Sequence, residues 1–240
     1  MTRPEPVRLH FRGAAAWPRW LKPDHDKSDP GLFRVDREHV DQVLDRTVCA
    51  FYEDPLWAGI LPDRQTRYSK MCALFGFLLR FGVMFGEVYA PSEELEGVAV
   101  WLPEKYARSD GWPAFRAGAL SIMFRVDMPS LGRLAAVGRH TSAQRRKHLP
   151  GPHWYLALLG VGPEFQGRGF GRRLLWPMLD RLDQENLPVW LDTETEENVR
   201  YYERIGFEVR DDHVVPEADV RLWGMCRTPG RKPDINSMDD

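Results

Sequence analysis

Residues 154–175 read WYLALLGVGPEFQGRGFGRRLL, and this stretch decides the fold. The run 154–161 is continuously apolar, which is typical of a strand that is buried on both faces. Glycines at 167, 169 and 171 permit a tight backbone turn, and apolar residues at helical spacing follow from Leu174 to Leu182. The stretch therefore predicts a central strand, a glycine-rich turn and a helix, with a kink or break at Pro177 inside that helix.

The glycine-rich turn predicts a binding site for phosphate or pyrophosphate. A helix begins there, and its free N–H groups and positive dipole end favour an anion, to which Arg168, Arg172 and Arg173 add charge. A Walker A loop is excluded because Arg168-Gly169 replaces the required Lys and Ser or Thr. The glycines also read GxGxG rather than the GxGxxG of a dinucleotide fold. A turn that merely connects strand and helix is the alternative.

The periodicity of the remaining chain predicts alternating helices and strands. The pair Asp54-Pro55 is expected to end the first helix, and Met71–Phe85 is interpreted as a buried helix because Arg80 interrupts its apolar run. The predicted helices are 40–51, 66–85, two within 112–149, one around 174–182 and 198–205, and the predicted strands are 32–35, 87–90, 97–102, 154–161, 189–192, 207–210 and 220–226. This order predicts a mixed α/β sheet with a helical insert.

The composition of the chain limits the partners, metal sites and cellular location that we expect. The 240 residues carry a net charge of −2, so a chain-wide electrostatic grip on nucleic acid is not expected. The three cysteines form no CxxC, which excludes a zinc ribbon, and we expect no metal ion. Without a signal peptide or a membrane span, we expect a cytoplasmic protein. The expected organisation is an extension (1–30), one domain (31–227) with the insert at 112–149, and a disordered tail (228–240).

Two motifs resemble the GNAT superfamily of N-acetyltransferases. Gln166-x-x-Gly169-x-Gly171 is similar to its acetyl-CoA loop, and NVRYYERIGF at 198–207 is similar to its second signature. Residues 154–226 look like the puromycin N-acetyltransferase-like branch, with Asp192 where that branch usually has Glu. The resemblance implies the GNAT fold: a mixed, mostly antiparallel sheet with flanking helices and a helical insert between the third and fourth strands. It also implies transfer of an acetyl group from acetyl-CoA to a primary amine by direct attack in a ternary complex.

The resemblance also assigns residues to the cosubstrate. The pyrophosphate would lie on the turn, and the pantetheine arm would pair with the end of the central strand, where a bulge near Gly160 would open a slot. The residues assigned in this way are Leu159, Gly160, Val161, Gln166, Gly167, Arg168, Gly169, Phe170, Gly171, Arg172 and Asn198.

Two catalytic roles follow. Tyr202 matches the superfamily's general acid, the alternative being a packed aromatic, and a backbone N–H near Leu158 or Leu159 would stabilise the oxyanion. An amine with a pKa near 10.4 is mostly protonated at neutral pH, so a base is needed. Asp192 is the first candidate, and Glu53, Asp54 and Glu194 are the alternatives.

The acceptor is less defined by sequence. We expect a small amine if the insert roofs a pocket, and Trp57, Phe81, Phe85, Trp112 and Phe115 are possible lining residues. Neither nucleic acid nor a membrane is expected as a partner. A protein acetyltransferase and a non-catalytic acyl-CoA sensor stay open as alternatives, as does the oligomeric state.

Overall fold

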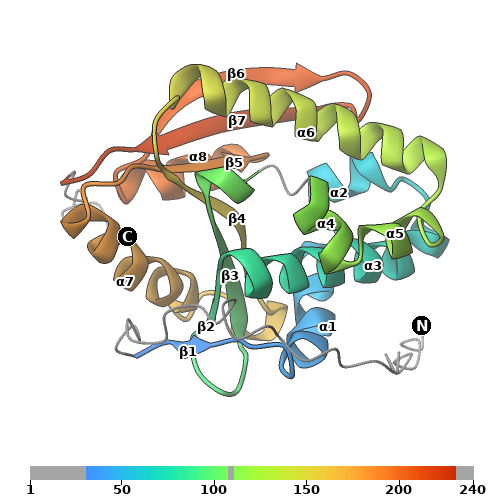
Figure 1. Ribbon diagram of the computed structural model, residues 1–240, viewed down its shortest axis with the longest axis horizontal. Coiled ribbons are helices and arrows are strands. Elements are labelled where there is room, and N and C mark those ends of the chain that lie inside the picture. Colours follow the sequence, from blue (N-terminus) through green and yellow to red (C-terminus); the bar gives the residue numbers. More distant parts are fainter. Residues whose placement is uncertain (1–30, 108–110, 231–240) are drawn as a thin grey trace.

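A seven-stranded sheet forms the centre of the molecule (Figure 1). The computed structural model describes residues 31–107 and 111–230, so the predicted extension and most of the predicted tail lie outside it. The strand order is β1-β2-β3-β4-β5-β7-β6, and every neighbouring pair is antiparallel except the parallel pair β4 and β5, which confirms the predicted fold class. The strands are β1 (Phe33–Arg34), β2 (Glu87–Ala90), β3 (Gly97–Pro103), β4 (Trp154–Val161), β5 (Val189–Thr193), β6 (Glu208–Val215) and β7 (Val220–Arg227).

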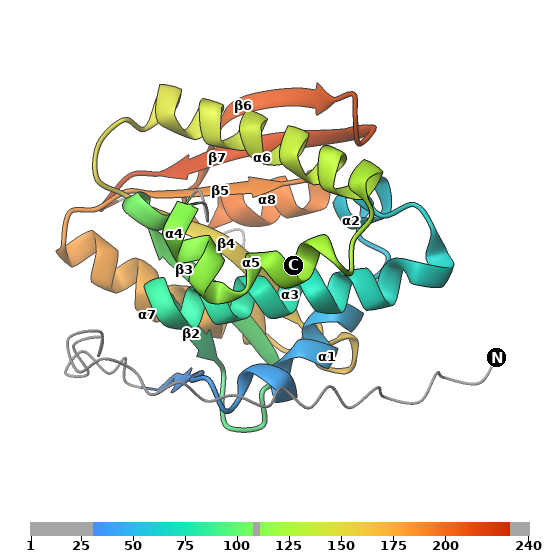
Figure 2. The ribbon, with the colours of Figure 1, turned by 45° about the vertical axis from the view of Figure 1, so that its right-hand side comes forward.

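Helices cover both faces of this sheet (Figures 1 and 2). One face packs on α1, α2, α3 and α6, and the other packs on α7 and α8. The helices are α1 (Val40–Phe51), α2 (Pro55–Ile60), α3 (Arg64–Phe85), α4 (Gly111–Ala117), α5 (Ala119–Met123), α6 (Met128–His148), α7 (Phe170–Gln184) and α8 (Glu196–Arg204). The segment α4–α6, between β3 and β4, is the predicted helical insert.

Helix α3 is long and apolar enough to cross a bilayer by length and composition alone. Its residues Met71, Phe75 and Leu79 are fully buried against the sheet and α1, as in the core helix of a globular domain. Burying each such side chain contributes about 1.5–3 kcal/mol to folding. The packing therefore agrees with the interpretation of this segment as a buried helix.

A bulge in β4 decides which way the strand's side chains point. Val100 lies opposite Leu158 and Trp101 opposite Leu156, so Ala157 is an extra residue in β4. Leu156 and Leu158 would share a face in a regular strand, but Leu156 packs on the α7 side and Leu158 on the α3 side. The predicted bulge at Gly160 is wrong, because Gly160 stays in register with Val98. The ring of Phe51 lies where a Cβ on Gly160 would be, so this glycine accommodates α1 instead.

Three local predictions are corrected. Asp54-Pro55 begins a helix rather than ending one: Asp54 caps α2 by accepting the Trp57 N–H at 3.2 Å, and Pro55 takes the first helical position, which needs no donor. The insert holds three helices instead of two, because Gly118 adopts a left-handed φ of 99° between α4 and α5. Helix α7 runs through Pro177 without a break.

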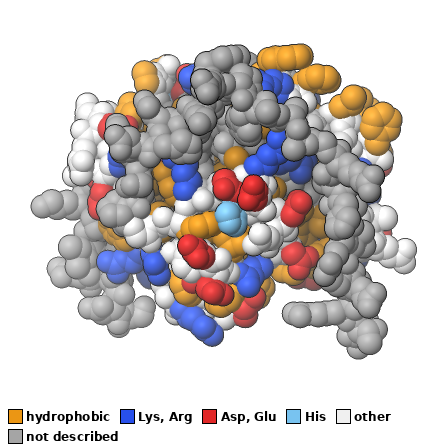
Figure 3. All heavy atoms as spheres, turned by 60° about the horizontal axis from the view of Figure 1, so that its bottom comes forward, with side chains coloured by type: hydrophobic (Ala, Val, Ile, Leu, Met, Phe, Trp, Pro, Cys, Tyr) orange, Lys and Arg blue, Asp and Glu red, His pale blue; other side chains and the backbone are white. Residues whose placement is uncertain are grey.

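The charged side chains of the surface are mixed in sign. On the side of α1 and the β2–β3 connection, acidic side chains lie around a histidine with lysine and arginine side chains near them (Figure 3). Local pairs such as Asp36 with His39, 2.7 Å apart, belong to this side. This distribution fits the near-zero net charge of the chain.

Candidate active site

The two parallel strands separate and leave a cavity between them. Pairing joins Trp154–Leu156 of β4 to Val189–Leu191 of β5, and beyond it β4 continues to Val161 and β5 to Thr193. A cavity of about 740 Å³ opens at this divergence. Backbone from the β4 bulge to Leu159 lines it, so peptide groups released from sheet pairing face the space.

The insert roofs the cavity. Ile122 of α5 and Leu134, Val137 and Thr141 of α6 line it, and an apolar wall opposite comes from Phe51, Leu56, Trp57, Ile60, Leu74, Phe77 and Leu78. Of the five aromatic residues expected here, the cavity wall contains only Trp57. Phe81 and Phe85 pack on each other in the core, with ring centroids 5.0 Å apart. Trp112 and Phe115 stack on the surface, 69% and 54% exposed, so the expectation that they line the acceptor pocket is wrong.

The glycine-rich turn has the geometry of an anion cradle. Gly167 and Gly169 have left-handed φ values of 74° and 78°, and a Cβ on either would meet no atom within 4 Å. Gly169 is the N-cap residue of α7. Because glycine has no side chain, it offers no side-chain oxygen to accept the first N–H groups of α7. Gln166 donates to the Val161 carbonyl at 3.2 Å, which ties the turn to the end of β4. A pyrophosphate fits this open, donor-rich loop.

Arginines flank the turn as predicted. The Arg168 guanidinium lies 5.7 Å from the Phe165 ring centre, and that of Arg172 lies 5.6 Å from the ring of Trp176. Both residues are exposed. Arg173 instead donates to the Gly31 carbonyl at 3.2 Å, which ties it to the start of the domain.

Tyr202 faces the cavity from α8. Thr195 caps this helix and accepts the Asn198 N–H at 3.2 Å, so Asn198 lies in the first turn of α8. Tyr202 is 9% exposed, and its ring meets Tyr201 and Phe207 edge-on. Burial raises the pKa of Tyr202, helped by Tyr201 and Glu194, so the phenol stays protonated at neutral pH.

The neighbouring Tyr201 has its hydroxyl beside the glycine-rich turn, a position that no motif predicted. Its hydroxyl is buried without a hydrogen-bond partner among the described residues. It lies 3.5 Å from the position that a Cβ on Gly171 would take, beside the start of α7. Burial raises the pKa of Tyr201 to about 12. The consecutive tyrosines in RYYER were the available signal, because neighbours on a helix point in directions about 100° apart.

A pair of carboxyl groups lies in the same cavity wall. Asp54 at the start of α2 and Glu194 at the end of β5 hydrogen-bond to each other, and the Asn198 side-chain amide donates to Glu194 at 3.3 Å. Burial raises the pKa of Asp54, and burial together with the Asp54 charge raises that of Glu194 well above its usual range. Two carboxylates this close cannot both ionise easily, so the pair binds a proton more readily than an isolated acid.

Asp192 also lines the cavity, but other groups engage it. Its Oδ1 accepts the Trp190 indole N–H at 3.1 Å, and Tyr155 and the Arg145 charge lie beside it. Burial raises the pKa of Asp192, while Arg145 and these hydrogen bonds oppose the rise. Glu53 is exposed and pairs with Arg64 outside the cavity lining. Of the four predicted bases, the structure therefore brings Asp54, Asp192 and Glu194 to the cavity.

Comparison with known proteins agrees with the resemblance to the GNAT superfamily. The Acetyltransferase (GNAT) family matches residues 89–207, a range that contains β3, β4, the turn and α8. An uncharacterized N-acetyltransferase of Schizosaccharomyces pombe is 24% identical over 196 residues, which are 76% of this chain and 79% of that protein.

Solved structures share the fold. A crystal structure of histone acetyltransferase HPA2 and related acetyltransferase from Corynebacterium glutamicum has a TM-score of 0.59 at 22% identity, covering 84% of this chain and 97% of the other. A polyamine N-acetyltransferase of Drosophila melanogaster has a TM-score of 0.52 at 17% identity, covering 82% and 98%. With the two motifs and the divergent strands, these similarities show the GNAT fold and support an N-acetyltransferase.

Proposed function

We propose that this protein transfers the acetyl group of acetyl-CoA to the primary amine of a small molecule by direct attack in a ternary complex. The observation that carries the proposal is the roofed cavity at the β4–β5 divergence, with Tyr202 and the Asp54–Glu194 pair in its wall. The resemblance to the puromycin N-acetyltransferase-like branch remains a prediction.

The turn and the end of β4 would hold the cosubstrate. Backbone N–H groups from Gln166 to Gly171 would bind the pyrophosphate, and Arg168 and Arg172 would supply charge. The released peptide groups of Leu159–Val161 can pair with an amide-containing arm as an added strand would. The unpartnered Tyr201 hydroxyl beside Gly171 is available as a further donor.

Catalysis by these residues begins with the removal of a proton from the ammonium group of the acceptor. We assign the base to the Asp54–Glu194 pair rather than to Asp192, because Glu194 lies near Tyr202 and the charge of Asp54 raises the pKa of Glu194. The pair takes a proton from the ammonium, and the neutral nitrogen then attacks the thioester carbon, forming the C–N bond. A backbone N–H at the β4 bulge stabilises the oxyanion. The C–S bond then breaks, and the Tyr202 O–H donates its proton to the departing sulfur. The nitrogen releases its second proton to give the neutral amide, and that proton restores the Tyr202 hydroxyl by way of solvent.

The shape of the cavity favours a small acceptor with an apolar body. Its apolar wall would take the body, while the carboxyl pair would bind the cationic amine. A screen with acetyl-CoA and an amine panel that includes agmatine, polyamines and arylalkylamines, read by free thiol, tests the proposal. Turnover of a small amine supports it. Turnover of peptide amines alone would favour a protein acetyltransferase, and acetyl-CoA binding without any turnover would favour a sensor.

The variant Gly169→Val tests the turn. A β-branched residue is strained at a φ of 78°, and its side chain would enter the anion space. We expect acetyl-CoA affinity, measured by calorimetry, to fall at least tenfold, or about 1.4 kcal/mol. Gly230→Val is the matched control, because its φ is 74°, it also meets no atom within 4 Å, and it lies outside the turn. Equal affinity in a folded Gly169→Val protein would remove the turn from the cosubstrate site.

The variant Gly138→Leu tests the roof. Gly138 lines the cavity from α6, and a Cβ there meets no atom within 4 Å, so the larger side chain fills space without a clash. We expect the acceptor KM to rise at least about tenfold, the cost of roughly 1.4 kcal/mol of lost binding, with little change in the acetyl-CoA KM. Gly132→Leu is the control, since Gly132 lies on the same helix in open space outside the cavity lining. The same KM in both variants would place the acceptor elsewhere.

A further inference from the structure

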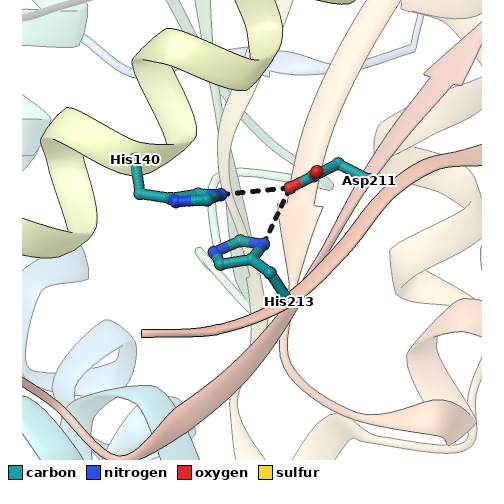
Figure 4. Close-up of side chains that lie close together, drawn as sticks. All are labelled: His140, Asp211 and His213. Atoms are coloured by element: carbon teal, nitrogen blue, oxygen red, sulfur yellow. Dashed lines mark hydrogen bonds and ion pairs between the residues drawn. The ribbon is translucent and has the colours of Figure 1, made fainter. Parts of the chain in front are cut away.

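A second cluster of reactive side chains lies between the roof helix α6 and the edge strand β6. It consists of His140 on α6 and Asp211 and His213 on β6 (Figure 4). A bulge in β6 at Arg210 shifts the strand's alternation, so that Asp211, His213 and the buried Val215 share the face toward α6. The adjacent Asp212 is exposed and pairs with Arg221 instead.

The ligand atoms of the cluster converge. Nε2 of His140 lies 3.2 Å from Oδ2 of Asp211, and Nδ1 of His213 lies 2.7 Å from the same oxygen (Figure 4). One ligand atom from each residue falls within 4.8 Å of the others. Metal–nitrogen and metal–oxygen distances near 2.0–2.2 Å require ligand atoms about 3 Å apart, so an ion would draw these atoms together and turn the stacked rings.

The protein alone leaves this cluster incompletely satisfied. The two imidazole rings stack with centroids 3.2 Å apart and planes 19° apart, a contact that disfavours two positive rings. Nε2 of His213 is buried without a hydrogen-bond partner among the described residues, while Nδ1 contacts the Asp211 carboxylate.

We propose that His140, Asp211 and His213 bind a divalent first-row metal ion, Zn²⁺ foremost, that joins α6 to β6. Two imidazoles and one carboxylate are a ligand set that Zn²⁺ accepts, and three protein ligands leave one position for water. The ion would bind to the lone pairs of ring nitrogen and carboxylate oxygen atoms that accept no hydrogen bond in the cluster.

The position of the site gives the ion a structural role. His213 lies opposite Leu222 of β7, and Leu222 lines the acceptor cavity. Helix α6 carries His140 and also roofs that cavity. A metal bridge would therefore hold the roof against the far edge of the sheet, without itself touching the reacting atoms.

Zinc binding by the full-length, tag-free chain tests the proposal. After treatment with a chelator and dialysis, we expect one equivalent of Zn²⁺ by mass spectrometry of the metal, and a melting temperature raised by about 5 °C or more at a hundredfold excess over Kd. Asp211→Asn and His213→Ala should each weaken binding by at least about tenfold, because even outer partners of a metal site cost 10–100-fold. Co²⁺ should give a visible spectrum of a nitrogen- and oxygen-ligated ion that these variants lose.

Matched variants separate the site from adventitious binding. Asp212→Asn changes an acid on the other face of β6, and His148→Ala changes an exposed histidine on α6, so both should bind zinc as the wild type does. His140→Ala removes a ligand from a helix surface and keeps the test decisive if a β6 variant fails to fold. Absence of zinc binding, equal binding in wild type and His140→Ala, or an equal thermal shift with Mg²⁺ would overturn the proposal.

Discussion

Replacing Tyr202 by Phe is expected to lower turnover by roughly 10² or more while leaving acetyl-CoA affinity within a few-fold. The substitution removes one hydroxyl from a ring that is 9% exposed and keeps its contacts with Tyr201 and Phe207. Because its pKa is raised, Tyr202 holds its proton and acts as a hydrogen-bond donor to the sulfur as charge develops there. Affinity should persist because backbone groups of the turn and β4 are the proposed cosubstrate ligands.

Steady-state kinetics and calorimetry check this prediction. The loss should shrink with acetyl donors whose thiols are more acidic, since such thiolates leave with less help. Tyr89→Phe is the control, because Tyr89 is equally buried but its hydroxyl bonds Glu87 away from the cavity. If Tyr202→Phe turns over like this control, the proton comes from water or from another residue.

Replacing Glu194 by Gln is expected to lower turnover and, at high pH, to raise the melting temperature. Turnover should fall by about 10²–10⁴-fold if the carboxyl pair accepts the amine proton. The carboxamide keeps the size of the side chain and its contact with Asn198, but it cannot take up a proton. Asp192→Asn should lower turnover less, and Glu53→Gln, which changes an exposed acid beside Asp54, should leave it unchanged.

Stability should move in the opposite direction, and its sign follows from the raised pKa of Glu194. A group whose pKa is higher in the folded state stabilises the fold fully below its unfolded pKa, near 4.3, and loses that contribution as pH rises through its folded pKa. The Gln side chain does not ionise, so the variant loses no such contribution as the pH rises. The melting temperature of Glu194→Gln should therefore exceed that of wild type at about pH 8 and approach it at about pH 5. A difference that does not grow with pH would contradict the shared-proton pair.

Much of the fold was readable from local pattern. Continuous apolar residues at 154–161 predicted β4, and apolar spacing predicted α1, whose bounds Val40–Phe51 the structure reproduces. These signals are local, because periodicity and glycine conformation depend on near neighbours along the chain. The left-handed glycines at 167 and 169 made the anion turn predictable for the same reason.

Other features depended on contacts between distant segments. The β4 bulge falls at Ala157 because the pairing with β3 shifts register between Val100 and Trp101, and no residue type in LALL at 156–159 marked it. Trp112 and Phe115 had the composition of pocket residues, but the docking of the insert turns them outward. Likewise, Asp54 and Glu194 are 140 positions apart, and only the meeting of α2 with the end of β5 makes them a pair.

The sequence by itself predicted most of the order of elements, the glycine-rich turn and the resemblance to the GNAT superfamily, since each depends on consecutive residues. Tertiary structure alone decided which acids share the cavity and what roofs it. It also decided where His140, Asp211 and His213 meet. The physical reason is that a pKa, a cavity or a ligand set is a property of groups within a few ångströms of one another, and folding sets those distances between residues that lie far apart in the sequence.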